Sequence, residues 1–346
     1  MEYPSFDKPK AGAFRFNTDN NQLEIYDGNQ WTGVVSTSPE LQTGGTRMCM
    51  GGGWVPGGTD RIALLQIHTT GSIEDFGDLN TARYSNGGYA DRTRGVFTGG
   101  RNDPAPSTSM TIKDYFAMAS GGQATNWLVL STARESQAGF SDSTRGMDAG
   151  GKQNGTPLES IDYTTIQSAG ESVDWGDLTV ARGKPGGCSS PTRGIVFCGD
   201  GPNHTTYHNT IQYVTISTTG KGSDFGDSAV EQSSADGGSN AVRGVLGCGI
   251  ASPAYSRTLE YVTMATLGNA IDFGDSIAAN NALASRATGA SSTRVVWAAG
   301  AFPSSPYAQS DVEYVNIAST GNGIDWGDAL DSNEASFGIT NGHGGL

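Results

Sequence analysis

Three segments of the chain alternate apolar and polar residues in the same way. They read IQYVTI at 211–216, LEYVTM at 259–264 and VEYVNI at 312–317. Alternation with a period of two places successive side chains on opposite faces of a strand, so the pattern predicts half-buried β-strands. Each of the three follows a more continuously apolar segment that begins with arginine, such as RGIVFCG at 193–199. Such a segment is typical of a strand that is buried on both faces.

This pairing of segments recurs about every 50 residues. A motif of the form DFGD or DWGD, which we call the DxGD motif, occurs five times, and Asn126-Trp127 stands where a sixth copy is expected. Its aromatic residues, spaced by 51, 48, 50, 48 and 53 residues, are Phe76, Trp127, Trp175, Phe225, Phe273 and Trp326. The arginines that open the apolar segments keep the same period, at Arg47, Arg94, Arg145, Arg193, Arg243 and Arg294. Self-similarity of this length indicates a propeller or solenoid, whose units bury their apolar faces by stacking on one another.

Each repeat has room for four antiparallel strands, the number found in one propeller blade. The last DxGD motif is followed by a segment with the length and register of a first strand, whereas the first repeat, 47–79, lacks a first strand. We therefore expect the C-terminal segment to complete the first repeat, which would close the ring without an open sheet edge. The predicted fold is all-β, a six-bladed β-propeller over 44–346.

The repeat resembles the kelch repeat. In that family an arginine opens the inner strand, a double glycine ends the second strand, a tyrosine marks the third and a tryptophan begins the fourth. The matching residues here are Arg83, Arg134 and Arg182; Gly99-Gly100 and Gly150-Gly151; Tyr115, Tyr163, Tyr213, Tyr261 and Tyr314; and the aromatic residue of the DxGD motif. Later copies depart from the pattern, with Gln232, Asn280 and Asn333 in place of the opening arginine. The resemblance implies a kelch-like propeller but does not identify the function, because kelch propellers serve both as enzymes and as binding modules.

Residues 1–40 lie outside the repeat. Two β-rich runs, 13–16 and 23–26, flank turn-forming residues, and a third run after Asp27-Gly28 ends in Trp31. This pattern predicts a small β-hairpin extension, which is too short for a core of its own and should dock on something.

The same segment, GAFRFNTDNNQLEIYDGNQW at 12–31, resembles a short module of bacteriophage tail-fibre and other virion proteins, particularly those of marine phages. The resemblance implies that the extension docks on other virion proteins. The residues expected at that contact are Phe14, Phe16, Leu23, Tyr26 and Trp31. The alternative is a hairpin that packs on the side of the propeller.

Composition narrows the possible functions. The chain of 346 residues contains 51 glycines, and their fixed offsets mark turns of an ordered fold. A formal net charge of −14 argues against binding to nucleic acid, which requires clustered Lys and Arg. Four cysteines are too few for a disulfide scaffold. We interpret Cys198 and Cys248 as core residues, with a Cys188–Cys198 bridge as the alternative. No segment approaches the ~20 apolar residues of a membrane helix, and no export signal is recognisable.

Two repeated features have both a functional and a structural interpretation. The six arginines of the apolar segments could form a ring of positive charge at one mouth of the channel. We predict instead that each is held by a neighbouring DxGD carboxylate or by turn carbonyls, because unpaired arginines at close range repel one another. The DxGD aspartates could bind calcium, but that ion needs six to eight oxygen ligands. We predict that the first aspartate caps its own turn.

Recognisable catalytic and metal-binding patterns are not found. His204 and His208 are four residues apart, but Gly201 and Pro202 place them in a loop, and no further zinc ligands accompany them. Phosphate-binding and nucleophile motifs are also not found. We therefore expect no metal, no cofactor and no catalytic residue.

The connections between second and third strands are the most varied part of the repeat. Antiparallel geometry places all six on the same side of the ring, where they would form a surface suited to sugars or proteins. The candidate binding residues on them are Trp54, His204, Tyr207, His208, Tyr255, Phe302 and Tyr307. The alternative is a set of solvated loops with scattered aromatic side chains.

The resemblance of the N-terminal segment implies a phage virion protein, and we expect that it is not an enzyme. Its expected role is that of a tail fibre or surface-displayed propeller that recognises a host-surface glycan or protein, attached through 1–40 and present in several copies. A first alternative is a capsid or tail decoration or adaptor protein. A second is an extracellular propeller enzyme that acts on glycans.

Overall fold

A computed structural model describes residues 9–17, 22–33, 46–55, 57–71, 73–102, 108–168, 170–251, 254–277, 285–302 and 308–346. The chain forms two compact units, Met1–Gln42 and Thr43–Leu346. Both are built of β-strands, and the described residues contain no α-helix, only the 3-10 turn η1 (Pro202–His204). The prediction of an all-β protein is therefore confirmed.

The smaller unit is a three-stranded antiparallel sheet. Its strands, in spatial order, are β1 (Phe14–Asn17), β2 (Gln22–Tyr26) and β3 (Trp31–Gly33). The carboxylate of Asp27 accepts hydrogen bonds from the N–H groups of Asn29 and Gln30, both at 2.7 Å, and this turns the chain back on itself. Trp31 consequently begins a third strand. The prediction that a run ends at Trp31 was wrong.

Residues of the virion-module resemblance gather on one side of this small sheet. The Arg15 guanidinium forms an ion pair with Glu24 at 2.7 Å and lies 4.4 Å from the centre of the Trp31 ring. Asn17 donates a hydrogen bond to the same carboxylate, at 3.0 Å. Tyr26 packs against Trp31 with 5.3 Å between ring centres. Among the described residues, a unit too small for an apolar core is thus held by a salt bridge, a cation–π contact and a tilted aromatic pair.

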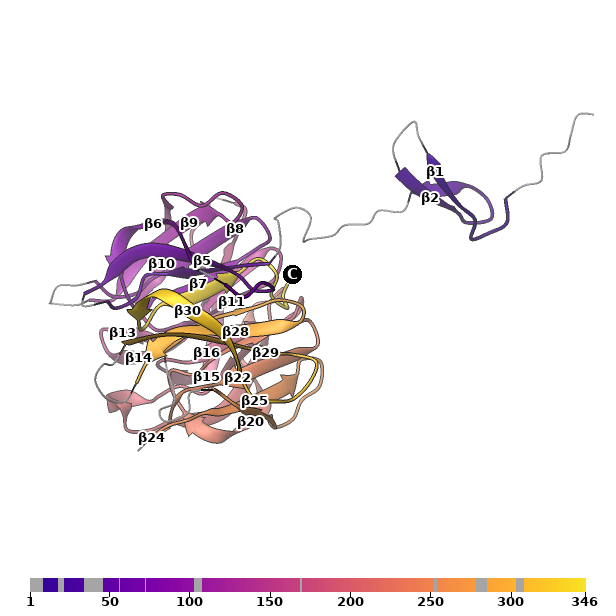
Figure 1. Ribbon diagram of the computed structural model, residues 1–346. Coiled ribbons are helices and arrows are strands. Elements are labelled where there is room, and N and C mark those ends of the chain that lie inside the picture. Colours follow the sequence, from indigo (N-terminus) through magenta and orange to yellow (C-terminus); the bar gives the residue numbers. More distant parts are fainter. Residues whose placement is uncertain are drawn as a thin grey trace, which may run out of the picture. The chain divides into compact units, whose positions relative to one another are not determined.

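The described residues of the larger unit include six sheets that share one order of four antiparallel strands, and Figure 1 shows them coloured along the chain. Their first strands are β31 (Phe337–Thr340), β7 (Gly87–Ala90), β11 (Ala138–Ser141), β16 (Gly186–Ser189), β21 (Asp236–Ser239) and β27 (Ala287–Ala290). Their second strands are β4 (Arg47–Gly51), β8 (Arg94–Thr98), β12 (Arg145–Ala149), β17 (Arg193–Phe197), β22 (Arg243–Gly247) and β28 (Arg294–Ala301).

The third and fourth strands complete each sheet toward its outer edge. The third strands are β5 (Thr59–Gln66), β9 (Met110–Ala117), β14 (Thr156–Thr165), β18 (His208–Thr215), β25 (Thr258–Thr263) and β29 (Ala308–Asn316). The fourth strands are β6 (Glu74–Arg83), β10 (Thr125–Arg134), β15 (Val173–Arg182), β20 (Ser223–Gln232), β26 (Ile271–Asp275) and β30 (Ile324–Asn333). Four short strands are added to this plan: β13 (Lys152–Gln153), β19 (Gly220–Lys221), β23 (Ile250–Ala251) and β24 (Ala254–Tyr255).

The two ends of the larger unit meet in one sheet. Strand β31, close to the C-terminus, pairs with β4, so that Ile339 lies opposite Cys49. In Figure 1 the yellow C-terminal end lies beside the indigo strands of this sheet. The first strands also contact one another in the cyclic order β7, β11, β16, β21, β27, β31 and again β7. The C-terminal segment therefore supplies the first strand of the first sheet, as expected.

Small residues occur where two backbones approach. A Cβ atom added at Gly139 on one first strand would overlap the carbonyl oxygen of Gly88 on the next. The small residue that ends each second strand is left-handed, with φ of +58° at Gly99 and +61° at Gly150. Cys198, at +59°, keeps the same conformation with a side chain present. All four cysteines are buried and free, so the alternative of a Cys188–Cys198 bridge was wrong.

The six arginines that open the second strands tie each sheet to the next. Arg193, for example, lies 4.5 Å from the Tyr213 ring centre and donates a hydrogen bond to the carbonyl of Met264 in the following sheet, at 2.8 Å. Arg294 closes the cycle by donating to Ile67 of the first sheet, at 3.1 Å. The other carbonyl acceptors are Met118, Ile166, Ile216 and Ile317. The predicted turn carbonyls are confirmed as partners, whereas the DxGD carboxylates are not the partners in these hydrogen bonds.

The DxGD motif makes a second contact between sheets. The Asp174 carboxylate accepts a hydrogen bond from the N–H of Gly176 at 3.0 Å, and Asp75 and Asp325 do the same in their own copies. The cap predicted for the first aspartate is therefore confirmed in these copies. Gly176 has a φ of +135°, and a Cβ atom there would overlap the carbonyl oxygen of Gly220. The glycine allows the next turn to approach.

The arginines that open the inner strands are buried. Arg83 forms an ion pair with Asp114 at 2.7 Å, and Arg134 forms one with Asp162 at 3.0 Å. Arg182 instead donates to the carbonyls of Cys198 and Thr210. Burial lowers the pKa of the Arg182 guanidinium to about 10.

The last sheet obtains its buried guanidinium from a residue that the sequence did not single out. Arg286 forms an ion pair with Glu313, and its Nη2 donates to the Trp297 carbonyl at 2.9 Å. The kelch comparison placed Asn280 in this role, a position outside the described residues. Arg286 lies three residues beyond the register of Arg83, Arg134 and Arg182 and reaches an equivalent carboxylate.

A single methyl group should test the contact between sheets. The substitution Gly176→Ala should lower the free energy of unfolding by about 2 kcal/mol or more, because the added Cβ meets backbone that has little room to move. Gly220→Ala is the matched control, since a Cβ at that position has nothing within 4 Å. Chemical denaturation of both variants measures the difference. Equal stabilities would contradict the proposed role of Gly176.

Loss of one arginine tie should weaken the ring. Arg193→Ala removes a charged hydrogen bond and a contact with an aromatic ring, so the free energy of unfolding should fall by about 2 kcal/mol. Lys221→Ala removes an exposed cation and serves as the control. Thermal and denaturant unfolding provide the comparison. If the free energy of unfolding of Arg193→Ala equals that of the parent, this contact does not stabilise the fold.

Candidate functional site: a cavity on the loop face

The connections from second to third strands lie at the same end of the sheets as those that lead into the first strands. Isolated β-bridges join the two sets. The bridges connect Trp54 with Glu334, Tyr84 with Arg101, Glu135 with Lys152, Gly183 with Asp200, and Ser233 with Ile250. We call this end of the larger unit the loop face. It is the side on which the sequence analysis placed the varied connections.

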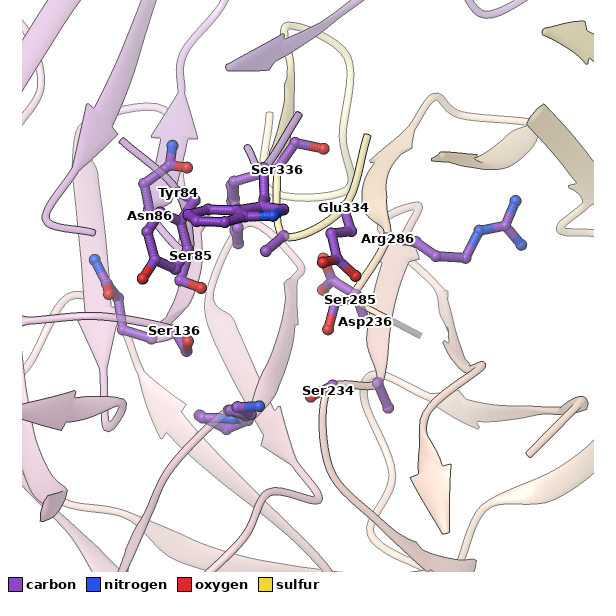
Figure 2. Close-up of a pocket in the computed structure, with 17 residues that line it drawn as sticks. Tyr84, Ser85, Asn86, Ser136, Ser234, Asp236, Ser285, Arg286, Glu334 and Ser336 are labelled. Carbon is purple, nitrogen blue, oxygen red and sulfur yellow. The ribbon is translucent and has the colours of Figure 1, made fainter. Parts of the chain in front are cut away.

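A cavity of about 370 Å³ opens at the loop face, where the six sheets converge. It is lined by the residues that precede the six first strands, and Figure 2 shows several of them around it. One residue of each connection has a left-handed backbone with φ between +49° and +55°. These six residues, the cavity ring, are Ser85, Ser136, Lys184, Ser234, Ser285 and Ala335.

Main-chain hydrogen bonds join the members of the cavity ring. The N–H of one member donates to the carbonyl of the member before it. The bonds run from Ser85 to Ala335 (2.7 Å), Ser136 to Ser85 (2.6 Å), Ser234 to Lys184 (3.0 Å), Ser285 to Ser234 (3.1 Å) and Ala335 to Ser285 (3.1 Å). Because these bonds use the backbone groups, a ligand in the cavity would meet mainly side chains.

Several polar side chains beneath the ring have unused hydrogen-bonding atoms. Asn86, Gln137 and Ser336 are only 3 %, 2 % and 6 % exposed. Both amide atoms of Asn86, Oε1 of Gln137 and Oγ of Ser336 find no hydrogen-bond partner among the described residues, and neither does Oγ of Ser234. Buried polar atoms are nearly always paired in folded proteins, so a cluster of unpaired ones at a cavity indicates a place for a polar ligand or water.

An aromatic pair forms one part of the cavity wall. The rings of Trp54 and Tyr84 meet edge to face with 4.9 Å between their centres. The N–H of Trp54 donates to the carbonyl of Glu334 at 2.7 Å, which fixes the connection that carries it. Both side chains are half-buried. They present an apolar surface beside the hydroxyl and amide groups.

Three ionisable groups line the cavity and have no ion pair with a described residue: Lys184, Asp236 and Glu334. Burial raises the pKa of the Asp236 carboxyl to about 7 and also raises that of Glu334. Burial lowers the pKa of the Lys184 ammonium, and Asp200 partly offsets this effect. Arg286 also borders the cavity, but its guanidinium is engaged by Glu313 and points away from the other labelled residues in Figure 2.

The loop residues singled out by sequence are divided among different surroundings. Trp54 lines the cavity, whereas Tyr207, Tyr255 and Phe302 are half-buried on connections outside its lining. Tyr307 lies outside the described residues. The ring residues and Asn86, Gln137 and Ser336 were not expected. The recurrence of serine at 85, 136, 234 and 285 is the sequence signal that could have revealed them.

The two loop histidines belong to different polar groups. Nδ1 of His204 lies 2.5 Å from Asp200, and the same carboxylate accepts a hydrogen bond from Lys152 at 2.8 Å. Burial lowers the pKa of His208, and Arg182 adds to that effect. Among the residues that the structure describes, no group of three or more His, Cys, Asp or Glu side chains is placed to hold a metal ion.

The opposite end of the ring axis is covered by the C-terminal residues. The N–H of Gly344 donates to the carbonyl of Ser239 at 2.7 Å. Nε2 of His343 lies 2.9 Å from the Ala90 carbonyl and 3.1 Å from the Ser141 hydroxyl. Burial lowers the pKa of this histidine. The loop face is therefore the end at which a cavity opens.

The residues predicted for virion docking also separate into two groups. Within the smaller unit, Phe14, Phe16 and Leu23 are 63 %, 61 % and 44 % exposed, and they come from adjoining positions of β1 and β2. Tyr26 is only 6 % exposed and packs on Trp31, so this pair contributes to the unit itself. An apolar surface remains on Phe14, Phe16 and Leu23.

No known family matches the sequence, and no curated protein is similar to it. None of the described segments is a helix long and apolar enough to cross a membrane.

The raised pKa of Asp236 predicts a pH-dependent loss of stability. A carboxyl that ionises near pH 7 in the folded state but near 4 when unfolded costs stability as pH rises between those values, because the unfolded chain releases its proton first. Asp236→Asn should therefore be more stable than the parent at about pH 8, with the difference vanishing at about pH 4. Denaturation at both pH values tests this, with the exposed Asp60→Asn as control. A difference independent of pH would contradict it.

Proposed function

We propose that residues 44–346 form a six-bladed, kelch-like β-propeller. Three observations support this assignment. Six sheets share one order of four antiparallel strands, the first strands contact one another in a closed cycle, and Arg294 ties the last sheet to the first. A ring of this kind leaves no sheet edge at its seam.

We further propose that the protein is a non-enzymatic component of a phage virion, attached through residues 1–40. The sequence resemblance of 12–31 to virion modules supports this setting. Within the smaller unit, Phe14, Phe16 and Leu23 expose an adjoining apolar surface. Contiguous exposed apolar residues are typical of sites that bind another protein. Another virion protein is the partner that the resemblance implies.

In this proposal the propeller recognises the host. It belongs to a tail fibre or is displayed on the particle surface, and it contacts the host surface through its loop face; we call it a recognition head. The observation that carries this proposal is the cavity at that face, where buried polar atoms without partners lie beside the Trp54 and Tyr84 rings. Pockets with convergent polar groups and an apolar wall are typical ligand sites. The alternative role, a decoration or adaptor protein, rests on the same exposed residues of the smaller unit.

Two sets of substitutions in the full chain distinguish these roles. Particles assembled with the double variant Phe14→Ser, Phe16→Ser should contain much less of this protein, because the docking surface is apolar. Quantitative blotting of purified particles measures the amount. Particles with Trp54→Ala should retain the protein but adsorb to host cells at least about tenfold more slowly. Lys221→Ala is the control for both.

The outcomes separate the proposals clearly. Normal adsorption of the Trp54→Ala particles would refute recognition through the cavity and favour the adaptor. Normal incorporation of the Phe14→Ser, Phe16→Ser protein would refute attachment through the smaller unit.

A further inference from the structure

The loop-face cavity has a composition that suits one class of ligand. We propose that it binds a single uncharged sugar unit of a host-surface polysaccharide. This inference rests on the proposed recognition role and specifies which ligand the site takes. Its support comes from the size, the hydrogen-bonding groups and the charges of the cavity.

Size limits the ligand to a small molecule or the end of a chain. Ligand pockets in proteins range from about 300 to 1,000 Å³, and this cavity, at about 370 Å³, lies near the lower limit. It can take one or two sugar rings. A folded partner would contact the surrounding connections rather than the cavity.

The polar groups favour a ligand that both donates and accepts at many points. Asn86 offers a donor and an acceptor, Gln137 offers an acceptor, and the Ser336 hydroxyl offers both. All three residues are more than nine-tenths buried, so these atoms lose hydrogen bonds to water and gain none from the described residues. The amide nitrogen of Gln137 is held by Thr98, at 3.0 Å from its carbonyl, which leaves only Oε1 of that side chain to a ligand. The hydroxyl groups of a sugar can supply both kinds of partner to such a cluster.

The aromatic pair suits the apolar faces of a sugar ring. A pyranose ring has C–H groups on its faces, and these pack against aromatic rings, whereas its hydroxyl groups lie around its edge. Trp54 and Tyr84 provide the apolar wall, and the serines of the cavity ring border the remainder. The cavity therefore presents both kinds of surface to one ring.

Charge excludes strongly ionic sugars. An acidic sugar would approach Asp236 and Glu334 in a protein with a net charge of −14. An amino sugar with a free ammonium group would approach Lys184. Because the unpaired charges are of both signs and lie around one small space, an uncharged ring avoids repulsion from either.

Saturation-transfer NMR on the full chain provides the test. The probes are the methyl glycosides of glucose, galactose, mannose and N-acetylglucosamine, with glucuronate and glucosamine as charged counterparts. At least one neutral glycoside should bind at millimolar concentration, and both charged sugars should bind at least about tenfold more weakly. Failure of all neutral probes, or preference for a charged sugar, would overturn the proposal.

Two variants locate the site. Trp54→Ala should weaken binding of the glycoside about tenfold or more. Ser336→Ala should weaken it several-fold while the melting temperature stays the same or rises, because that hydroxyl has no partner among the described residues. The Ser336 variant keeps the test valid even if loss of Trp54 disturbs the fold. Binding unaffected by Ser336→Ala would overturn the assignment to the cavity.

Tyr207→Ala serves as the comparison, because Tyr207 is on the loop face but does not line the cavity. It should leave glycoside binding unchanged. Weakening by Tyr207→Ala alone would move the site to the surrounding connections, which refutes the cavity while the recognition role stands. Loss of that role would be seen separately, as normal host adsorption by particles that carry Trp54→Ala and Tyr207→Ala together.

Discussion

The close approach of one sheet's backbone to the next is the constraint on which the larger unit depends. At Gly176, which faces the carbonyl of Gly220, and at Gly139, which faces the carbonyl of Gly88, the main chains come so near that a methyl group does not fit. Such proximity leaves only small residues at these positions and explains much of the chain's glycine content. It also brings carbonyl groups within reach of the arginines that open the second strands. Steric and polar contacts between sheets are thus consequences of the same spacing.

The repeat made most of this architecture predictable from sequence. The alternation at 211–216 and the period of the DxGD motif indicated the strands, and the surplus segment at the C-terminus indicated how β31 would pair with β4. Prediction failed where a repeated structural role is filled by a residue at a different position of the repeat. Arg286 reaches Glu313 from outside the register of the other buried arginines. Periodicity detects what recurs at a fixed offset, so a compensating residue at a new offset escapes it.

The cavity was harder to foresee because it has no local signal. Its lining comes from six connections that are distant in sequence, and each contributes only a few residues. Asn86, Gln137 and Ser336 occupy the same place in their repeats but have different side chains, so they do not appear as a motif. Of the loop residues proposed from sequence that the structure describes, only Trp54 lines the cavity. Aromatic residues of the connections were the binding residues predicted from sequence, whereas the polar atoms that have no partner among the described residues are buried.

A ring of similar sheets separates the demands of folding from those of recognition. The backbone bonds of the cavity ring need a left-handed residue in each repeat, but they use only main-chain atoms. Serine, lysine and alanine all occupy these positions, which shows that the scaffold tolerates different side chains there. Six connections can therefore differ freely in chemistry while their backbones stay in register. Such a site can match an asymmetric ligand. The repeat of the site lies in its main chain, whereas the side chains that a ligand would touch differ from one connection to the next.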